Sequence, residues 1–235
     1  MIDAADLRYE IKMVCEERAR EAVMAALNLH HLGIRKLYPP RQVQSLYFDT
    51  PGCRALEDNI AGINRRSKIR FRWYGSATQQ VRGSLERKIR GNNLGRKDVL
   101  RIDALLDVLG TSRAAFHRTL LDACEGKWRQ DLGAGLEITQ WISYEREYLI
   151  TGDRRVRITV DRELRSYDQR FRMHLSQAQP TPLDRVLIVE CKAPVSRLET
   201  LDELVRRLPL KPDKCSKYVL ASAQRHGPTV SRLGW

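Results

Sequence analysis

The chain has 235 residues, a length that fits one domain of ordinary size. Hydrophobic residues make up 42% of it and charged residues 30%, which excludes a disordered chain. No apolar run reaches the roughly 18 residues of a membrane-spanning helix. The formal net charge of +13 favours polyanionic partners, whether nucleic acid, anionic lipid or phosphate chains.

The cysteines and the first residues bear on the cellular compartment. Five cysteines, at positions 15, 53, 124, 191 and 215, form no CxxC pair. Their odd number predicts reduced thiols and argues against a disulfide framework or a zinc ribbon. Residues 1–6 lack the basic and apolar regions of a signal peptide. We therefore expect a cytoplasmic protein with no direct membrane insertion.

Alternating polar and apolar residues predict strands in the first half of the chain. The expected strands are 7–14, 43–48, 67–74 and 81–90. Residues 16–32 are rich in Ala, Leu, Glu and Arg and end at Gly33, which predicts a helix. Pro39-Pro40 is expected to break the chain before the second strand, and 49–52 to form a turn.

The second half of the chain predicts both helices and strands. Helices are expected over 100–109, 114–129, 197–208 and 216–225. Strands are expected over 142–150, 154–160 and 185–191, with 171–175 as a weaker candidate and loops at 151–153 and 180–182. About eight strands in mostly sequential order predict an α+β fold: a closed eight-stranded antiparallel β-barrel with helices packed outside. We expect one domain over residues 1–235.

A charged tripeptide recurs three times inside the expected strands. It is Glu10-Ile11-Lys12, Glu86-Arg87-Lys88 and Glu190-Cys191-Lys192, and residues 66–74 add cations at 66, 68, 70 and 72. Because strand side chains alternate between faces, a Glu and a Lys two residues apart project to the same side. Carboxylates can hold a divalent cation, and cations can hold phosphate oxygens. These strands predict a site for a polyphosphate with its metal.

A simpler explanation is a sheet with its polar face in water, as is usual for one alternating strand. So much like charge on one open face would be repulsive without a bound anion. The repetition therefore favours an inward-facing set. The side chains expected to point into the barrel are Glu10, Lys12, Arg70, Arg72, Glu86, Lys88, Arg157, Glu190 and Lys192.

Eight short motifs follow one another along almost the whole chain, from about residue 7 to 222. They are RYEIK (8–12), SLYFDTP (45–51), RSKIRFRWY (66–74), LERK (85–88), YER (144–146), VRITVD (156–161), VECK (189–192) and SKY (216–218). Their order resembles the VTC domain, the vacuolar transporter chaperone or polyphosphate polymerase domain of the triphosphate tunnel metalloenzyme superfamily. Arg8 stands where that superfamily often begins an ExExK motif with Glu, as suits the VTC branch over the CYTH triphosphatase branch.

The resemblance implies an eight-stranded tunnel that cleaves the terminal phosphoanhydride of a nucleoside triphosphate and transfers the phosphate to a growing polyphosphate chain. It implies catalytic roles for Lys217, Arg70 and Arg72, and makes Glu190 the main ligand of Mn²⁺ or Mg²⁺. Phosphate contacts are implied for Lys12, Lys88, Lys97, Arg146, Arg157, Lys192 and Lys214. The strand alternation adds Arg66 and Lys68 as phosphate ligands and Glu10 and Glu86 as metal ligands.

Lys217 lies at the start of the last expected helix. A lysine there could enter one tunnel mouth, helped by the positive end of the helix, and hold a terminal phosphate. The alternative is a lysine on the surface of the helix. Under the first interpretation, Lys217→Ala should reduce transfer without altering stability, because substitution to Ala in an exposed helix is mild.

Three other functions stay open at this point. A metal-dependent triphosphatase would use the same lumen with water as the acceptor. A non-catalytic module that binds polyphosphate or inositol phosphates would need no carboxylate. Nucleic-acid binding would place basic residues on an outer face, and is not expected. The expected ligands are ATP or another nucleoside triphosphate, with polyphosphate, triphosphate or pyrophosphate, and the sequence leaves room for a membrane-protein partner.

Overall fold

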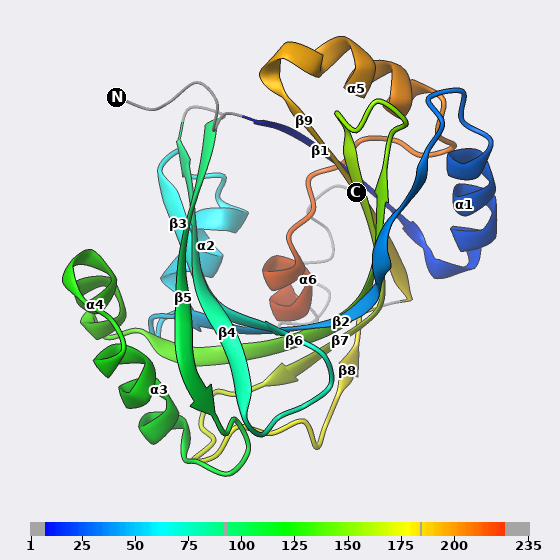
Figure 1. Cartoon of the computed structure of the whole chain (residues 1–235). Helices are drawn as coiled ribbons and strands as arrows, with labels where there is room; N and C mark the ends of the chain where they lie inside the picture. Colours follow the sequence, from blue (N-terminus) through cyan, green and yellow to red (C-terminus); the bar gives the residue numbers. More distant parts are fainter. Residues whose placement is uncertain (1–7, 92–93, 184, 224–235) are drawn as a thin grey trace.

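The computed structural model describes residues 8–91, 94–183 and 185–223 (Figure 1). Its strands form one antiparallel sheet in the order β1-β9-β7-β6-β2-β3-β4-β5, with the short β8 paired to β7. The strands are β1 (Arg8–Glu16), β2 (Arg35–Asp49), β3 (Arg66–Tyr74), β4 (Val81–Gly91), β5 (Leu94–Leu106), β6 (Glu137–Ile150), β7 (Arg157–Asp168), β8 (Thr181–Pro182) and β9 (Val186–Pro194).

The helices lie mostly on the outside of this sheet. They are α1 (Arg20–Asn28), α2 (Arg54–Ile60), α3 (Arg113–Asp122), α4 (Gly126–Gly133), α5 (Leu198–Arg206) and α6 (Lys217–Ala223). Figure 1 shows α1, α3, α4 and α5 on the convex side, whereas α6 lies within the curve of the sheet. There α6 contacts α2 and β6.

The sheet curves strongly but does not close, so the expected closed barrel is wrong in this respect. In the described part of the chain the two edge strands, β1 and β5, do not pair with each other. An ion pair spans the gap instead, because Lys88 Nζ on β4 lies 2.9 Å from Glu10 Oε1 on β1. A side-chain contact between β1 and β4, the neighbour of the edge strand β5, therefore bridges the opening where the described strands form no backbone ladder. The α+β class and the curved antiparallel sheet agree with the prediction.

The alternation of residues separates an apolar convex face from a charged concave face. On β3, Ile69, Phe71 and Trp73 are buried in the core under α3 and α4, while the residues between them face the other way. A second apolar cluster packs β1, β7 and β9 against α1 and α5. Burial of each large apolar side chain contributes about 1.5–3 kcal/mol. This core fixes the sheet that displays the charges.

Residues 100–109 were expected to form a helix but belong mainly to β5. Leu100 pairs with Leu85, and Ile102 with Gly83, in the β4–β5 ladder. Ile102 and Leu106 are both buried. Their spacing of four residues suits one face of a helix as well as one face of a strand, so the neighbouring strand decides the structure.

Other elements differ from the prediction in their bounds. β2 continues through Pro39 and Pro40, because register shifts on both sides of Tyr38 accommodate residues that cannot donate to the ladder. The expected helix over 16–32 shortens to α1 because β1 extends to Glu16, and 114–129 divides into α3 and α4. Residues 171–175 form no strand and contribute only an isolated bridge between His174 and Ser112.

Candidate anion-binding site

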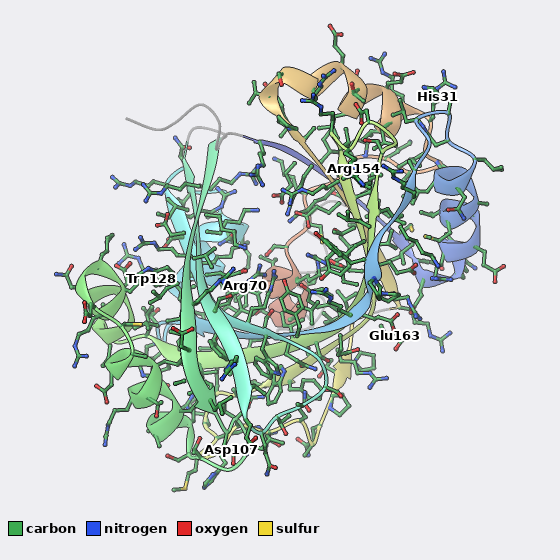
Figure 2. The ribbon with its side chains drawn as sticks, in the orientation of Figure 1. His31, Arg70, Asp107, Trp128, Arg154 and Glu163 are labelled. Atoms are coloured by element: carbon green, nitrogen blue, oxygen red, sulfur yellow. The ribbon has the colours of Figure 1, made fainter. Side chains whose placement is uncertain are left out.

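The concave face gathers charged side chains from seven strands and from α6. Nine are cations and four are carboxylates. The cations are Lys12, Lys68, Arg70, Arg72, Lys88, Lys97, Arg146, Lys192 and Lys217, and the carboxylates are Glu10, Glu86, Asp161 and Glu190. Figure 2 shows one of them, Arg70, inside the curve of the sheet, whereas Trp128 lies outside it on α4. We call these thirteen residues the central cluster.

Glu86 on β4 is surrounded by cations. Arg70 donates from Nε and Nη2 to Glu86 Oε2 at 2.8 and 2.6 Å, and Lys97 donates to Oε1 at 2.6 Å. Arg72 Nη1 lies 3.5 Å from Oε2. Burial disfavours the charged form of Glu86, but these cations outweigh it and lower the pKa of the carboxyl well below its usual range. Glu86 is therefore an ionised counter-charge that orients Arg70 and Lys97.

A second group joins β6, β7 and α6. Arg146 donates from Nε and Nη2 to the two oxygens of Asp161 at 2.6 and 2.7 Å, and Lys217 Nζ lies 2.6 Å from Asp161 Oδ2. The Asp161 side chain is 0% exposed. Burial opposes its ionisation, but Arg146 and Lys217 lower the pKa of Asp161. Asp161 thus holds both cations in place.

Aromatic side chains position α6 and its lysine. The hydroxyl of Tyr218 donates to Asp49 Oδ2 at 2.6 Å, and its ring stacks on Tyr47 with centroids 5.1 Å apart. Lys217 Nζ lies 4.8 Å from the ring centroid of Tyr144. The lysine side chain is only 10% exposed. The sequence-based alternative of a surface lysine is therefore wrong, because the residue turns into the sheet.

The third group lies where β1 meets β9. Lys192 Nζ is 3.0 Å from Glu190 Oε1 and 3.9 Å from Glu10 Oε2. Lys12 and Lys88 both approach Glu10 Oε1, at 3.1 and 2.9 Å. Burial opposes ionisation of Glu190, but Lys192 and Lys12 lower its pKa. The same carboxylates, Glu190 first and then Glu10, raise the pKa of Lys12 against the effect of burial.

These carboxylates differ in their fitness for a metal. Glu10 and Glu190 lie on neighbouring strands with Lys192 between them. Two carboxylates, completed by phosphate oxygens and water, form a donor set that Mg²⁺ commonly uses, so this pair fits a divalent cation that arrives with phosphate. Glu86 accepts two hydrogen bonds from Arg70 and one from Lys97, so it fits a metal poorly. Glu10 also accepts from Lys88 at both oxygens, so a metal there must displace that lysine, and Glu190 is the main candidate ligand. Among the described residues, no group of three or more His, Cys, Asp or Glu could hold a metal.

Some cations of the cluster are destabilised in their charged form by burial and by repulsion from neighbouring cations. Lys68 Nζ donates to Ser216 Oγ at 2.8 Å. Burial, followed by repulsion from Lys12 and Lys88, lowers the pKa of Lys68 to about 7. Burial is also the main reason why the pKa of Lys88 is lowered. A bound polyanion would relieve this repulsion.

We expect the affinity for tripolyphosphate to depend on the protonation of Lys68. Below a pH of about 7 the ammonium is present in the free protein, and above it the ligand must bring a proton with it. Affinity should therefore fall about tenfold as pH rises from about 6 to 8. Titration calorimetry of the wild type and of Lys68→Met over this pH range measures the effect. Tripolyphosphate itself also titrates, but its contribution is the same for both proteins and cancels in the comparison. The same pH dependence in both proteins would show that Lys68 does not contribute to binding.

Within the described ranges, several buried polar atoms of the concave face lack hydrogen-bond partners, among them one atom each of Arg72 and Thr159. Arg72 donates from Nη2 to the hydroxyl of Tyr144 at 3.2 Å, but its Nε has no partner. Thr159 Oγ1 is also without one, and Thr159 pairs with Glu190 in the β7–β9 ladder. Buried polar groups are normally satisfied, so both atoms offer contacts to a ligand. Sequence reasoning gave Thr159 no role.

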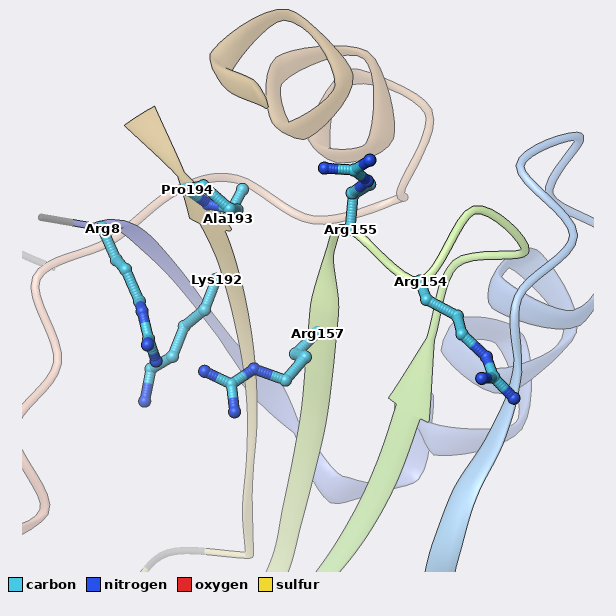
Figure 3. Close-up of a pocket in the computed structure, with 7 residues that line it drawn as sticks. All are labelled: Arg8, Arg154, Arg155, Arg157, Lys192, Ala193 and Pro194. Carbon is cyan, nitrogen blue, oxygen red and sulfur yellow. The ribbon is translucent and has the colours of Figure 1, made fainter. Parts of the chain in front are cut away.

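A basic pocket of about 220 Å³ adjoins this cluster at Lys192 (Figure 3). Its lining residues are Arg8, Arg154, Arg155, Arg157, Lys192, Ala193 and Pro194. We call this the arginine pocket. In Figure 3, the side chains of Arg8, Lys192 and Arg157 converge on one space. The expected phosphate ligand Arg157 thus lies in this pocket, beside its ladder partner Lys192.

Two expected phosphate ligands lie at the margin. Arg66 begins β3, and its Nη1 donates to the carbonyl oxygen of Ile63 at 2.6 Å. Burial, then Arg90 across the ladder, lowers the pKa of Arg66. Lys214 is exposed. Among the described residues, its side chain forms no ion pair with a member of the central cluster. The structure therefore gives Lys214 the weakest position in the expected set.

A curved antiparallel sheet with a cation-rich concave face is compatible with a tunnel-type fold. The sequence model of the VTC domain matches residues 7–226, so the chain belongs to the VTC domain family. This confirms the resemblance seen in the motifs and places the chain in a family that handles nucleotides and phosphate. No curated protein sequence gives a significant match.

Solved structures support the fold. A protein from Vibrio parahaemolyticus described as a "putative adenylate cyclase" is 14% identical, with a TM-score of 0.54 over 93% of this chain and 99% of that one. The Mediator head module of Schizosaccharomyces pombe gives 10% identity and a TM-score of 0.39 over 86% of this chain and 89% of the other, too weak to support an argument. No helix in the described ranges is long and apolar enough to cross a membrane.

Proposed function

We propose that this chain is an ATP-dependent polyphosphate polymerase, which transfers the terminal phosphate of a nucleoside triphosphate to a polyphosphate chain with a divalent cation, Mn²⁺ or Mg²⁺. One observation supports it above the others: the concave face of the sheet holds nine cations against four carboxylates. Nine cations on one face repel one another and are balanced only in part by four carboxylates, so the excess favours a highly charged anion.

The arrangement suits phosphoryl transfer. The bond between the β- and γ-phosphates breaks while an oxygen of the acceptor's terminal phosphate bonds to the γ-phosphorus. Such a reaction depends mainly on positioning and on neutralising charge on the phosphate oxygens. Arg70 and Arg72 are held by Glu86 and Tyr144 with their guanidinium groups oriented, which favours donation to those oxygens. The acceptor is already an anion, so no general base is required.

The arginine pocket favours a chain over water as the acceptor. Lys192 belongs both to this pocket and to the ion pairs of the central cluster. Beyond Lys192, the pocket is lined by four arginines: Arg8, Arg154, Arg155 and Arg157. A triphosphatase with water as acceptor has no use for binding positions past the triphosphate. A polymerase needs them to hold a repelling second anion.

Incubation with ATP and Mn²⁺ tests the proposal. We expect long-chain polyphosphate, resolved by gel electrophoresis, to accumulate with the release of ADP. Free phosphate without polymer would identify a triphosphatase instead. Tight binding of polyphosphate with no turnover would identify a non-catalytic binding module. Salt-sensitive DNA binding that excludes tripolyphosphate would point to a nucleic-acid site.

Loss of either paired arginine is expected to weaken triphosphate binding. Arg70→Ala and Arg72→Ala each remove charged hydrogen bonds worth about 1.5–3 kcal/mol, which lowers affinity by about 10- to 150-fold. Arg96→Ala is the matched control, because Arg96 is exposed and pairs with Asp98. Calorimetry with tripolyphosphate measures all three. Wild-type affinity in both test variants would show that the β3 cations do not hold the ligand.

A further inference from the structure

Three tyrosines surround an arginine beside the central cluster. The guanidinium carbon of Arg41 lies 5.4 Å from the ring centroid of Tyr38, 5.7 Å from that of Tyr74 and 5.9 Å from that of Tyr148. The rings of Tyr38 and Tyr148 meet edge to face. Tyr38 is 50% exposed and Tyr74 51%. These large rings are therefore accessible to a ligand, unlike the aromatic side chains of the core.

This group is continuous with the phosphate-binding side chains. Tyr74 follows Arg72 by two residues on β3, so both project from the concave face. Arg41 pairs with Arg146 in the β2–β6 ladder. Tyr148 follows Arg146 by two residues, and its phenol is close enough to Tyr74, Arg146 and Arg72 for each to influence its pKa, which burial chiefly raises. The tyrosines and the cations form one surface.

The chemistry of this surface differs from that of the central cluster. A simple phosphate chain presents only oxygens, which a tyrosine hydroxyl can bind but the flat face of its ring cannot. The tyrosine rings do provide flat faces for a planar ring, as in proteins that bind nucleic acids by stacking bases on aromatic side chains. The Arg41 guanidinium is a second planar group that can stack on such a ring. An open hollow of about 400 Å³, lined by Lys36, Leu37, Tyr38, Pro39 and Pro40, adjoins the same tyrosine.

We propose that Arg41 and the three tyrosines bind the base of the nucleoside triphosphate whose phosphates occupy the central cluster. The inference rests on the proposed function. It adds a site for the base, the part of a nucleotide that an inorganic polyphosphate lacks. Stacking tolerates every base, because each has a π-face. The site therefore selects nucleotides over tripolyphosphate without selecting strongly among bases.

Paired ligands test the base site separately from the phosphate site. Affinities for ATP and for tripolyphosphate are measured by calorimetry, without metal, for the wild type, Tyr74→Leu and Tyr74→Phe. We expect Tyr74→Leu to weaken ATP binding about tenfold and to leave tripolyphosphate binding unchanged. Tyr74→Phe keeps the ring and should bind both ligands as the wild type does. Tyr38→Leu, at an equally exposed ring, should reproduce the loss for ATP alone.

Other results would contradict either the base site alone or the base site together with the proposed function. Equal losses for both ligands would mean that the tyrosines only brace β2 near its prolines, and the base site would be wrong. Unchanged ATP binding in both Leu variants, with tripolyphosphate bound, would overturn the base site and leave the proposed function standing. A wild type that binds neither ligand would overturn both.

Discussion

Replacing Lys217 with Ala is expected to lower phosphate transfer by about 100-fold or more and to lower stability as well. The loss of transfer follows from removing a positioned cation from the site, in the range measured for single oxyanion donors. The loss of stability follows because Asp161, fully buried, would keep Arg146 as its one charged partner among the residues that the structure describes. Leaving part of a buried charge unsatisfied costs about 1–3 kcal/mol. The sequence-based expectation of an unchanged stability is thereby corrected.

A neutral hydrogen-bond donor separates the two effects. Lys217→Gln can still donate to Asp161, so thermal stability should recover in part, while transfer stays lost because the cation is gone. Lys211→Ala is the control, because Lys211 is exposed in the segment before α6. Thermal melts and polyphosphate synthesis are measured for all variants. Recovery of transfer together with stability would make Lys217 a structural residue.

Much of the concave face was predictable because strand alternation is a local property. Arg70 and Arg72 were predicted to share a face, and they do, since Phe71 between them and Trp73 after them are buried in the core. Cys191 was expected on the face opposite Glu190, and it is buried in the core with its pKa raised to about 12 by burial. Burial of the apolar side chains on one face of a strand thus places the alternate, charged side chains on the other face.

The pairing of those charges could not be predicted, because it depends on contacts between distant segments. Lys217 and Asp161 meet only when α6 enters the curve of the sheet. Asp161 stood in a matching motif, on the same strand face as Thr159, and that was a signal for its role. Lys88 reaches Glu10 because the sheet bends far enough to bring β4 opposite β1.

The remaining failures have the same origin. Nothing local to 100–109 distinguishes β5 from a helix until β4 provides a ladder. The group around Arg41 was missed because Pro39-Pro40 indicated a break in the chain. Those prolines instead lie inside β2, at the register shift between Tyr38 and Arg41, and both of these residues contact Tyr148.

Replacing Glu190 with Gln is expected to abolish metal-dependent turnover and to strengthen phosphate binding without metal. A carboxylate binds a hard divalent cation far better than an amide does, so Mn²⁺ affinity should fall by about 100-fold. The same change removes a negative charge from beside Lys192 and Arg146, so metal-free tripolyphosphate affinity should rise by about tenfold. Calorimetry with Mn²⁺ and with tripolyphosphate measures the two effects apart.

Glu86→Gln is the matched control, because Glu86 has the same 7% side-chain exposure as Glu190 and also faces cations. It should raise phosphate affinity in the same way and leave Mn²⁺ binding intact, since its oxygens accept from Arg70 and Lys97. If Mn²⁺ binding survives in Glu190→Gln but is lost in Glu10→Gln, the metal belongs to Glu10. If turnover keeps the same dependence on Mn²⁺ in all three variants, the carboxylates balance charge only, and the cation is bound through the phosphates of the ligand.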